Sequence, residues 1–150
     1  MQQLVVWTLD MQRYALPYSV VERIARAVEV TPLPDAPAIV RGIINVQGRV
    51  VPVVDVRVRF DLPARATALT DQIVLAQTAR RQVAFFVDAV DGLIDYAECD
   101  VVDTASIAPG TGGIAGVLKY SDGMILIHDL DRFLSLDEEN SLDMALSNPA

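Results

Sequence analysis

The residue types that most often act as catalytic bases and nucleophiles are scarce in this chain of 150 residues, which has one histidine and one cysteine. The histidine, His128, precedes Asp129, and a histidine beside an aspartate could form part of a hydrolase triad. Both lie in an apolar run at 125–130 that is typical of a strand, where neighbouring residues point to opposite faces of the sheet. We therefore predict a histidine that is packed or at the sheet rim, and no general base.

The remaining candidates for chemistry are equally isolated. Cys99 lies between Glu98 and Asp100, and nearby acids disfavour the thiolate and reduce its nucleophilicity. One histidine and one cysteine do not supply the converging ligands of a structural zinc site. The glycine-rich segment 110–113 lacks the Gly-Lys-Ser/Thr ending of a phosphate-binding loop, so a flexible connector is expected there. The sequence thus predicts a protein that is not an enzyme, with no metal and no cofactor.

Composition limits the class of protein. Apolar residues make up 52% of the chain and charged residues 21%, which is enough for one compact unit or two small ones that share a core. The apolar runs are far shorter than the ~18 residues of a membrane span, and no secretion signal is visible at the N-terminus. A single cysteine suits a reducing compartment. The net charge of −8 disfavours nucleic acid as a partner. We expect a cytoplasmic protein without direct membrane insertion.

The stretch 41–60 contains the clearest structural signal. Two β-branched runs, 43–46 and 49–56, are separated by Gln47-Gly48, which predicts a hairpin with a two-residue turn. Apolar residues at 50, 51, 53 and 54 occupy both faces of the second strand, so we expect it to be covered on both sides. Pro52 cannot donate a ladder hydrogen bond, which predicts a sheet edge or a bulge there.

Hairpin patterns recur along the chain and indicate an internal repeat. Hairpins are predicted at 3–16, 73–87 and 114–127, a helical turn leading into a strand at 18–27, an extended segment at 28–33, a short helix at 55–60, strand and bend at 93–102, and a closing helix capped by Asp129. Residues 50–56 align with 124–130, and residues 4–6 align with 73–75. Two copies of about five strands suit two small five-stranded SH3-like or OB-like barrels, because closure removes exposed edges. Chance alignment of valine-rich strands is the alternative.

A family resemblance extends over about residues 4–136. Gly42, two apolar residues, Asn45, a turn that ends in Gly48, and an apolar-proline-apolar run into Asp55-Val56-Arg57 resemble the signature of CheW-type chemotaxis coupling proteins. Other matching segments lie at 14–16, 21–22, 33–34, 87–90, 116–117 and 122–126.

The resemblance implies a noncatalytic adaptor that links the cytoplasmic tips of chemoreceptors to the regulatory domain of a CheA-type histidine kinase, in receptor arrays. It also implies a domain at 1–136 made of two intertwined barrel subdomains, about 14–70 and the remainder. Receptor helices are expected in the groove between the barrels, and the kinase on the outer surface of one barrel. The receptor-site positions that it implies are Val21, Arg23, Ile24, Gly42, Asn45, Gln47, Gly48 and Arg49. Val21 is expected to be an apolar docking side chain.

Two positions depart from the family pattern. The family usually has arginine where this chain has Gln47, and commonly has glutamate where it has Arg23. Both belong to the implied receptor site, so a coupling protein of a specialised system, such as pilus motility, is an alternative. Two rival classes are a double barrel that binds a small ligand in its groove and a structural subunit that self-associates.

Charged residues are unevenly distributed. Four arginines, Arg41, Arg49, Arg57 and Arg59, surround the 41–60 hairpin; they form either a solvated rim or a protein-contact surface, where arginine is enriched. The acidic tail at 137–150 could be a disordered segment or an amphipathic helix with Leu136, Leu142, Met144 and Leu146 near one side. We expect this tail to be dispensable for folding.

Overall fold

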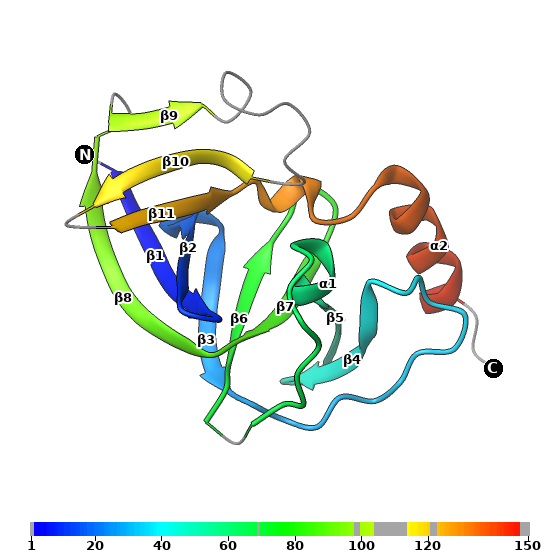
Figure 1. Ribbon diagram of the computed structural model, residues 1–150. Coiled ribbons are helices and arrows are strands. Elements are labelled where there is room, and N and C mark those ends of the chain that lie inside the picture. The colour runs from blue at the N-terminus through cyan, green and yellow to red at the C-terminus, as the bar shows by residue number, and fades with distance from the viewer. Residues whose placement is uncertain (1, 69, 98–99, 104–113, 121–122, 148–150) are drawn as a thin grey trace.

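Two β-sheets and a few short helices make up the fold (Figure 1) in a computed structural model that describes residues 2–68, 70–97, 100–103, 114–120 and 123–147. The six-stranded sheet contains β1 (Gln2–Leu9), β2 (Gln12–Pro17), β8 (Ala89–Tyr96), β9 (Val101–Asp103), β10 (Ile114–Tyr120) and β11 (Gly123–His128). The five-stranded sheet contains β3 (Val21–Arg26), β4 (Val40–Val46), β5 (Arg49–Val54), β6 (Gln72–Gln77) and β7 (Gln82–Val87). The helices are η1 (Tyr18–Val20), α1 (Val56–Arg59), η4 (Leu130–Arg132) and α2 (Leu136–Ser147). The all-β prediction is confirmed.

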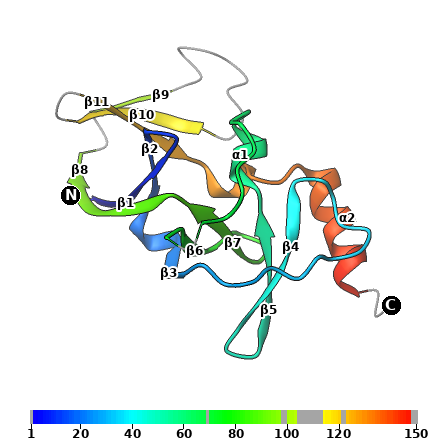
Figure 2. The same ribbon diagram turned by 60° about the horizontal axis from the view of Figure 1, so that its bottom comes forward.

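The two sheets have the same topology, and each combines strands from both halves of the chain. Their strand orders are β8-β1-β2-β11-β10-β9 and β3-β6-β7-β5-β4. The strands β1 to β5 correspond in turn to β6, β7, β8, β10 and β11. With these correspondences, the order β8-β1-β2-β11-β10 in the larger sheet becomes β3-β6-β7-β5-β4, which is the order of the smaller sheet. Each sheet therefore takes a two-strand hairpin from one half of the chain and its other strands from the other half: four strands in the six-stranded sheet, where β9 is the additional one, and three in the five-stranded sheet (Figures 1 and 2).

The register of the parallel strand pairs confirms the repeat at the level of single residues. In the six-stranded sheet Ala15 of β2 pairs with Ile127 of β11, and in the five-stranded sheet Ala84 of β7 pairs with Val53 of β5. Ala15 and Ala84 are 69 residues apart, and Val53 and Ile127 are 74 residues apart. These are the two offsets at which the sequence aligns with itself.

The five-stranded sheet curls without forming a continuous closed barrel. The chain beyond β3 returns to the opposite edge at a single bridge, where Thr31 and Ile43 exchange backbone hydrogen bonds of 2.9 and 2.8 Å. Gly42 lies at this bridge with φ of +152°, and a Cβ there would lie 2.2 Å from the carbonyl oxygen of Thr31. Gly116, its repeat counterpart, lies where β10 pairs with β9, and a Cβ there would lie 2.5 Å from Val101 Cγ1. Both glycines thus permit a close approach of backbones.

Several boundaries differ from the sequence predictions. The strands of the five-stranded sheet span 21–87 rather than about 14–70, because the β1–β2 hairpin pairs with β8 and β11. The segment 28–33 makes only the Thr31 bridge, and β8 begins at Ala89 rather than near 93. Pro52 lies inside the sheet, since β5 is between β4 and β7, and the bulge is in β4 between Val40 and Gly42. Both faces of β5 are covered from Val51 to Val54, as predicted, whereas Val50 is exposed.

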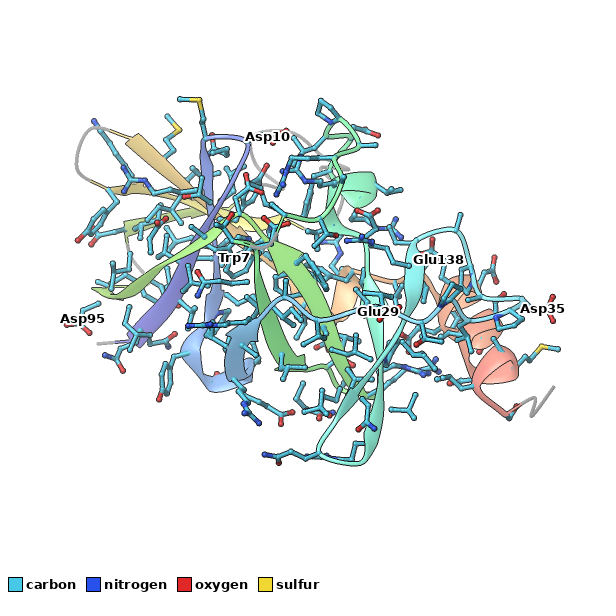
Figure 3. The ribbon with its side chains drawn as sticks, turned by 90° about the horizontal axis from the view of Figure 1, so that it is seen from below. Trp7, Asp10, Glu29, Asp35, Asp95 and Glu138 are labelled. Atoms are coloured by element: carbon cyan, nitrogen blue, oxygen red, sulfur yellow. The ribbon has the colours of Figure 1, made fainter. Side chains whose placement is uncertain are left out.

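The main hydrophobic core lies between the two sheets and joins them. It includes Trp7, Leu9, Tyr14, Leu16, Val54, Val74, Phe85, Leu130, Phe133 and Leu142. Trp7 is fully buried and lies in the interior of the molecule (Figure 3). Each sheet also has a smaller core of its own, around Ile125 and around Ile73. Burial of this kind provides most of the stability of a small domain.

The helix α2 occupies the segment that was expected to be an acidic tail or an amphipathic helix. A capping box starts it: Ser135 Oγ accepts a hydrogen bond from the Glu138 amide (3.1 Å), and Glu138 Oε1 accepts one from the Ser135 amide (2.7 Å). Leu142 is fully buried in the main core, and Glu139 is buried within 3.5 Å of both Arg80 and Arg81. The expectation that this segment is dispensable therefore conflicts with its packing.

We expect Leu142→Ala to lower the free energy of unfolding by about 2–4 kcal/mol, because it removes buried methyl groups and leaves a cavity. Met144→Ala is the matched control on the same helix, since Met144 is 73% exposed; its effect should be below about 0.5 kcal/mol. Urea denaturation of both variants measures the difference. Equal effects would show that α2 does not pack on the core in solution.

Gly42→Ala should destabilise the protein by about 2–4 kcal/mol, because its methyl group would separate the bridged strands. Gly48→Ala is the matched control: Gly48 also has positive φ, +86°, but a Cβ there meets nothing within 4 Å. The control should cost about 1 kcal/mol for the left-handed conformation alone. Thermal unfolding of the two variants tests this, and a Gly42→Ala protein as stable as the Gly48→Ala protein would contradict the tight bridge.

Candidate docking surface

The β4–β5 hairpin ends in a tight turn at Gln47-Gly48, as predicted. Val46 pairs with Arg49, and the two residues between them have positive φ of +51° and +86°, which is the geometry of a type I′ turn. Asn45 Oδ1 accepts a hydrogen bond of 2.8 Å from the Gly48 amide. Asn45 and Gly48 therefore shape the turn, and the exposed side chain of Gln47 is presented by it.

A hollow of about 190 Å³ lies where this turn meets β3. Its lining includes Arg23 and Arg26 from β3, Asn45 and Gln47 from the turn, and the apolar side chains Ala25, Val28, Ile44, Val46, Ile73 and Leu75. Ile44, Ile73 and Leu75 are buried in the small core of the five-stranded sheet and provide apolar walls. Segments about twenty residues apart meet here because β3 pairs with β6 while the following chain bridges to β4. Polar groups thus surround an apolar recess.

The other predicted site residues have different surroundings. Val21 and Ile24 are partly buried, pack against the main core and do not line the hollow. The docking role of Val21 stays a prediction. Gly42 is buried at the strand bridge. Arg49 is exposed beside the turn but does not line the hollow. Of the eight predicted positions, the structure brings Arg23, Asn45 and Gln47 together around the hollow.

Sequence reasoning missed the contribution of Arg26 and of the apolar walls. Arg26 follows Arg23 by three residues on a strand, and no sequence pattern connects either arginine to Leu75 of β6. Only the antiparallel register, in which Arg23 pairs with Leu75 and Ile24 with Val74, places them together. The capping box at Ser135 and Glu138, in contrast, is a sequence signal that could have predicted α2.

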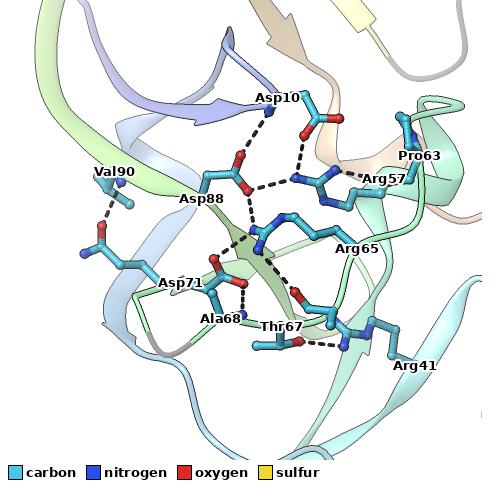
Figure 4. Close-up of polar contacts among 12 residues, drawn as sticks. Asp10, Arg41, Arg57, Pro63, Arg65, Thr67, Ala68, Asp71, Asp88 and Val90 are labelled. Atoms are coloured by element: carbon cyan, nitrogen blue, oxygen red, sulfur yellow. Dashed lines mark hydrogen bonds and ion pairs between the residues drawn. The ribbon is translucent and has the colours of Figure 1, made fainter.

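An ionic cluster connects the two sheets near the β1–β2 turn (Figure 4). Arg57 Nη2 lies 2.8 Å from Asp10 Oδ1 and 2.9 Å from Asp88 Oδ1, and the Asp10 amide donates a 3.0 Å hydrogen bond to Asp88. Burial by itself would raise the pKa of Asp88, but the hydrogen bonds from Asp10, Arg65 and Arg57 outweigh it and hold this pKa below its usual value. The carboxylate of Asp88 is thus favoured in its charged form.

The same cluster also fixes the position of the loop before β6 through ion pairs of Arg65. Arg65 Nη2 lies 2.8 Å from Asp71 Oδ1 and 2.5 Å from Asp88 Oδ1. Asp71 is buried, and its other oxygen accepts a 2.9 Å hydrogen bond from the Ala68 amide. Arg59 in turn pairs with Glu138 of α2 at 2.5 Å. The arginines at 57 and 59, considered as a rim or contact surface in the sequence, therefore make intramolecular ion pairs.

His128 is packed in the core, which is one of the two positions predicted for it. Its ring lies 4.3 Å from the ring of Phe60 and between 5.0 and 5.3 Å from those of Tyr14, Phe133 and Trp7, measured between centroids. Loss of hydration by burial lowers the pKa of His128 to about 3. Both ring nitrogens are buried, and neither has a hydrogen-bond partner among the residues that the structure describes. A neutral, enclosed imidazole of this kind is a packing residue.

The remaining predicted features give no site within the described residues. Cys99 and the segment 110–113 lie outside the residues that the structure describes. Among the described residues, no group of three or more His, Cys, Asp or Glu side chains could hold a metal ion. In the same part of the chain, no helix is long and apolar enough to cross a membrane.

A larger cleft of about 600 Å³ lies between the ends of the two sheets. Its lining combines apolar residues such as Leu16, Val20 and Ile127 with Gln2, Gln77, Asp129 and Asp131. Two polar groups of the cleft bond to each other, since the Tyr96 hydroxyl donates a 2.9 Å hydrogen bond to Gln2 Oε1. This cleft corresponds to the groove in which the small-ligand alternative would place its pocket, but none of the predicted receptor-site residues lines it.

Comparison with known proteins decides the family. The family model of the CheW-like domain matches residues 3–138. The chain belongs to the CheW-like domain family. A chemotaxis protein CheW from Rhizobium meliloti is 30% identical over 142 residues, which cover 93% of this chain and 92% of that protein. A chemotaxis protein CheW from Treponema pallidum is 25% identical and covers 93% and 86%, respectively.

A solved structure of the family shares the fold. The crystal structure of the scaffolding protein TtCheW from Thermoanaerobacter tengcongensis superimposes with a TM-score of 0.81 at 26% identity. The match covers 91% of this chain and 94% of that one. The resemblance identified in the sequence is confirmed, and the CheW-like family is one of chemotaxis scaffolds.

The burial of His128 makes a prediction for pH. As pH falls below about 6.5, the unfolded state takes up a proton on this histidine while the folded state stays neutral until about pH 3. The free energy of unfolding should therefore fall with pH, by about 2 kcal/mol between pH 7 and pH 5 from this group. His128→Phe should lack this part of the loss. Urea denaturation at both pH values checks it, and identical pH dependence of both proteins would show that His128 is accessible to protons.

Proposed function

We propose that this protein is a noncatalytic cytoplasmic adaptor that links the cytoplasmic tips of chemoreceptors to the regulatory domain of a CheA-type histidine kinase. The observation that carries the proposal is the membership of the CheW-like family over residues 3–138, together with an exposed recess formed by Arg23, Asn45 and Gln47. Recruitment to receptor arrays would follow from the contacts with these two partners. The protein itself would supply binding surfaces rather than chemistry.

The arrangement of the surface supports an adaptor. The recess is formed by a turn that an internal hydrogen bond fixes and by a strand within a sheet. Because these elements are already ordered, little conformational entropy is lost when a partner docks. Apolar walls can accept an aliphatic side chain, and the polar rim can set the orientation of the partner. Of the buried charged or polar residues that the structure describes, His128 has a packing role, and Asp71 and Glu139 make ion pairs.

A coupling protein of a specialised chemosensory system is the second candidate. The two departures from the family pattern, Arg23 and Gln47, line the same recess. Exchange of a glutamate for an arginine on one strand, and of an arginine for a glutamine on the turn, changes the charges that a receptor segment meets. Such changes alter partner choice more than fold.

The proposal is tested with the purified chain, receptor cytoplasmic fragments and kinase regulatory domains from several chemosensory systems of one genome. We expect one receptor fragment and one kinase domain to be captured together only when the chain is present, and kinase autophosphorylation to respond to that receptor. Capture of neither class in any combination would refute the adaptor role. Capture of only one system's components would decide between the ordinary and the specialised system.

Gln47→Arg restores the residue that is usual in the family and should change receptor affinity by about 3-fold or more, because it adds a charge at the recess. Stability should stay within about 0.5 kcal/mol, since the side chain is exposed. Gln82→Arg, on β7 and outside the lining of the recess, is the control for added charge. Isothermal titration with the receptor fragment and, separately, the kinase domain measures the effect. A change in kinase binding alone would show that the recess belongs to the kinase surface.

A further inference from the structure

We propose that the recess between β3 and the β4–β5 turn takes an acidic segment of the partner, in which an aliphatic side chain enters the recess and carboxylates meet Arg23 and Arg26. The inference deepens the proposed function and rests on it in one respect, that the partner is the receptor. In this proposal, Arg23 and Arg26 determine which partner segment binds.

The first argument is that these arginines lack carboxylate partners in the described part of the chain, while others have them. Arg57, Arg59, Arg65, Arg80 and Arg81 all make ion pairs with aspartates or glutamates. Arg23 and Arg26 make none there, although the whole chain has 20 acidic residues against 12 basic ones. Arg13, Arg41, Arg49 and Arg132 also lack ion pairs in the described structure, but only Arg23 and Arg26 line the recess. Unpaired cations on an acidic protein attract an anionic partner.

The second argument is the composition of the recess. Among the described residues, its lining contains two arginines, an asparagine, a glutamine and six apolar residues, and no carboxylate. Both arginines are exposed, whereas Ile44, Ile73 and Leu75 are almost completely buried. Cations at the rim of an apolar recess match a segment that carries acids beside an aliphatic side chain.

The third argument comes from the internal repeat. The six-stranded sheet has an equivalent hollow of about 370 Å³ lined by Val6, Ile94, Ile125 and others. At the 69-residue offset, Arg23 corresponds to Gly92 and Arg26 corresponds to Asp95. Asp91 also lines that hollow and accepts a 2.7 Å hydrogen bond from Thr8. The hollow of the six-stranded sheet thus combines one arginine, Arg13, with the carboxylate of Asp91, whereas the described lining of the recess has two arginines and no carboxylate. The excess of positive charge at the recess is therefore not a consequence of the shared backbone topology.

The test uses two synthetic helical peptides of about 20 residues, identical except that four positions around a central leucine are glutamate in one and lysine in the other. Each is titrated into the full-length ¹⁵N-labelled chain, and amide shifts are followed. The glutamate peptide should bind at least about 10-fold more tightly at low salt, weaken as salt rises, and shift the amides of Ile44, Gln47 and Leu75.

Substitutions separate charge selection from folding and from the adaptor role. The double variant Arg23→Glu, Arg26→Glu should reverse the preference between peptides, and Arg132→Glu, an exposed arginine in η4 outside the recess, should leave it unchanged. In the receptor assay the double variant should lose receptor binding and keep kinase binding. If receptor and kinase are still captured together by the double variant, the adaptor role stands and the acidic-segment proposal fails.

Other outcomes also overturn the proposal. Equal affinity for both peptides, absence of binding, or shifts at Val6 and Ile94 in place of Ile44 would each refute it. Sedimentation over a range of protein concentrations tests whether a second copy of the chain occupies the recess. Self-association that is lost in the double variant would assign the basic rim to contact between copies.

Discussion

The parallel pairings of β2 with β11 and of β5 with β7 are the constraint on which the rest of the structure depends. Each joins a hairpin from one half of the chain to the last strand of a hairpin from elsewhere, through Ala15–Ile127 in one sheet and Ala84–Val53 in the other. Neither sheet can therefore be completed by a continuous half of the repeat, although each has its own small core. The large core forms only when the two sheets are placed together; in it the ring centroids of Trp7 and Phe85 are 5.1 Å apart. Folding of either half alone would leave this apolar surface exposed.

The distribution of charge follows from the same arrangement. Where segments from different parts of the chain converge, arginines are used internally: Arg57 and Arg65 connect the loop before β6, the β1–β2 turn and the start of β8 through Asp88. Such partly buried pairs hold geometry, and their net contribution to stability is smaller than their number suggests. Where the five-stranded sheet opens to solvent, Arg23 and Arg26 stay free of carboxylates in the described structure. The charged groups where segments converge are thus paired within the protein, whereas those at the open end of the sheet are available for the partner that we propose.

The helix α2 extends the structural unit beyond the family match. The CheW-like model ends at residue 138, two residues after α2 begins. The rest of the helix nevertheless contributes Leu142 to the main core and Glu139 to a contact with Arg80 and Arg81 at the β6–β7 turn. An acidic segment can dock in this way because its acids at 138, 139 and 143 meet arginines, and its leucine enters the core on the same side of the helix.

The sequence by itself determined the strands, the turns and the family. Period-two and β-branched runs with Gln47-Gly48 or Asp10-Met11 between them are local signals, and the turns form there with positive φ as such turns require. The repeat and the burial of His128 also followed from spacing and apolar context. The tertiary structure alone decided which hairpin enters which sheet, because the parallel pairings join strands that are not neighbours in sequence, and that of β2 with β11 brings together residues more than a hundred positions apart. It also decided that Val21 faces the core while Arg23 faces the recess, since a bulge between them changes the alternation of the strand. A one-residue irregularity of this kind leaves no mark in composition or periodicity, and it reverses the side of the sheet to which a residue points.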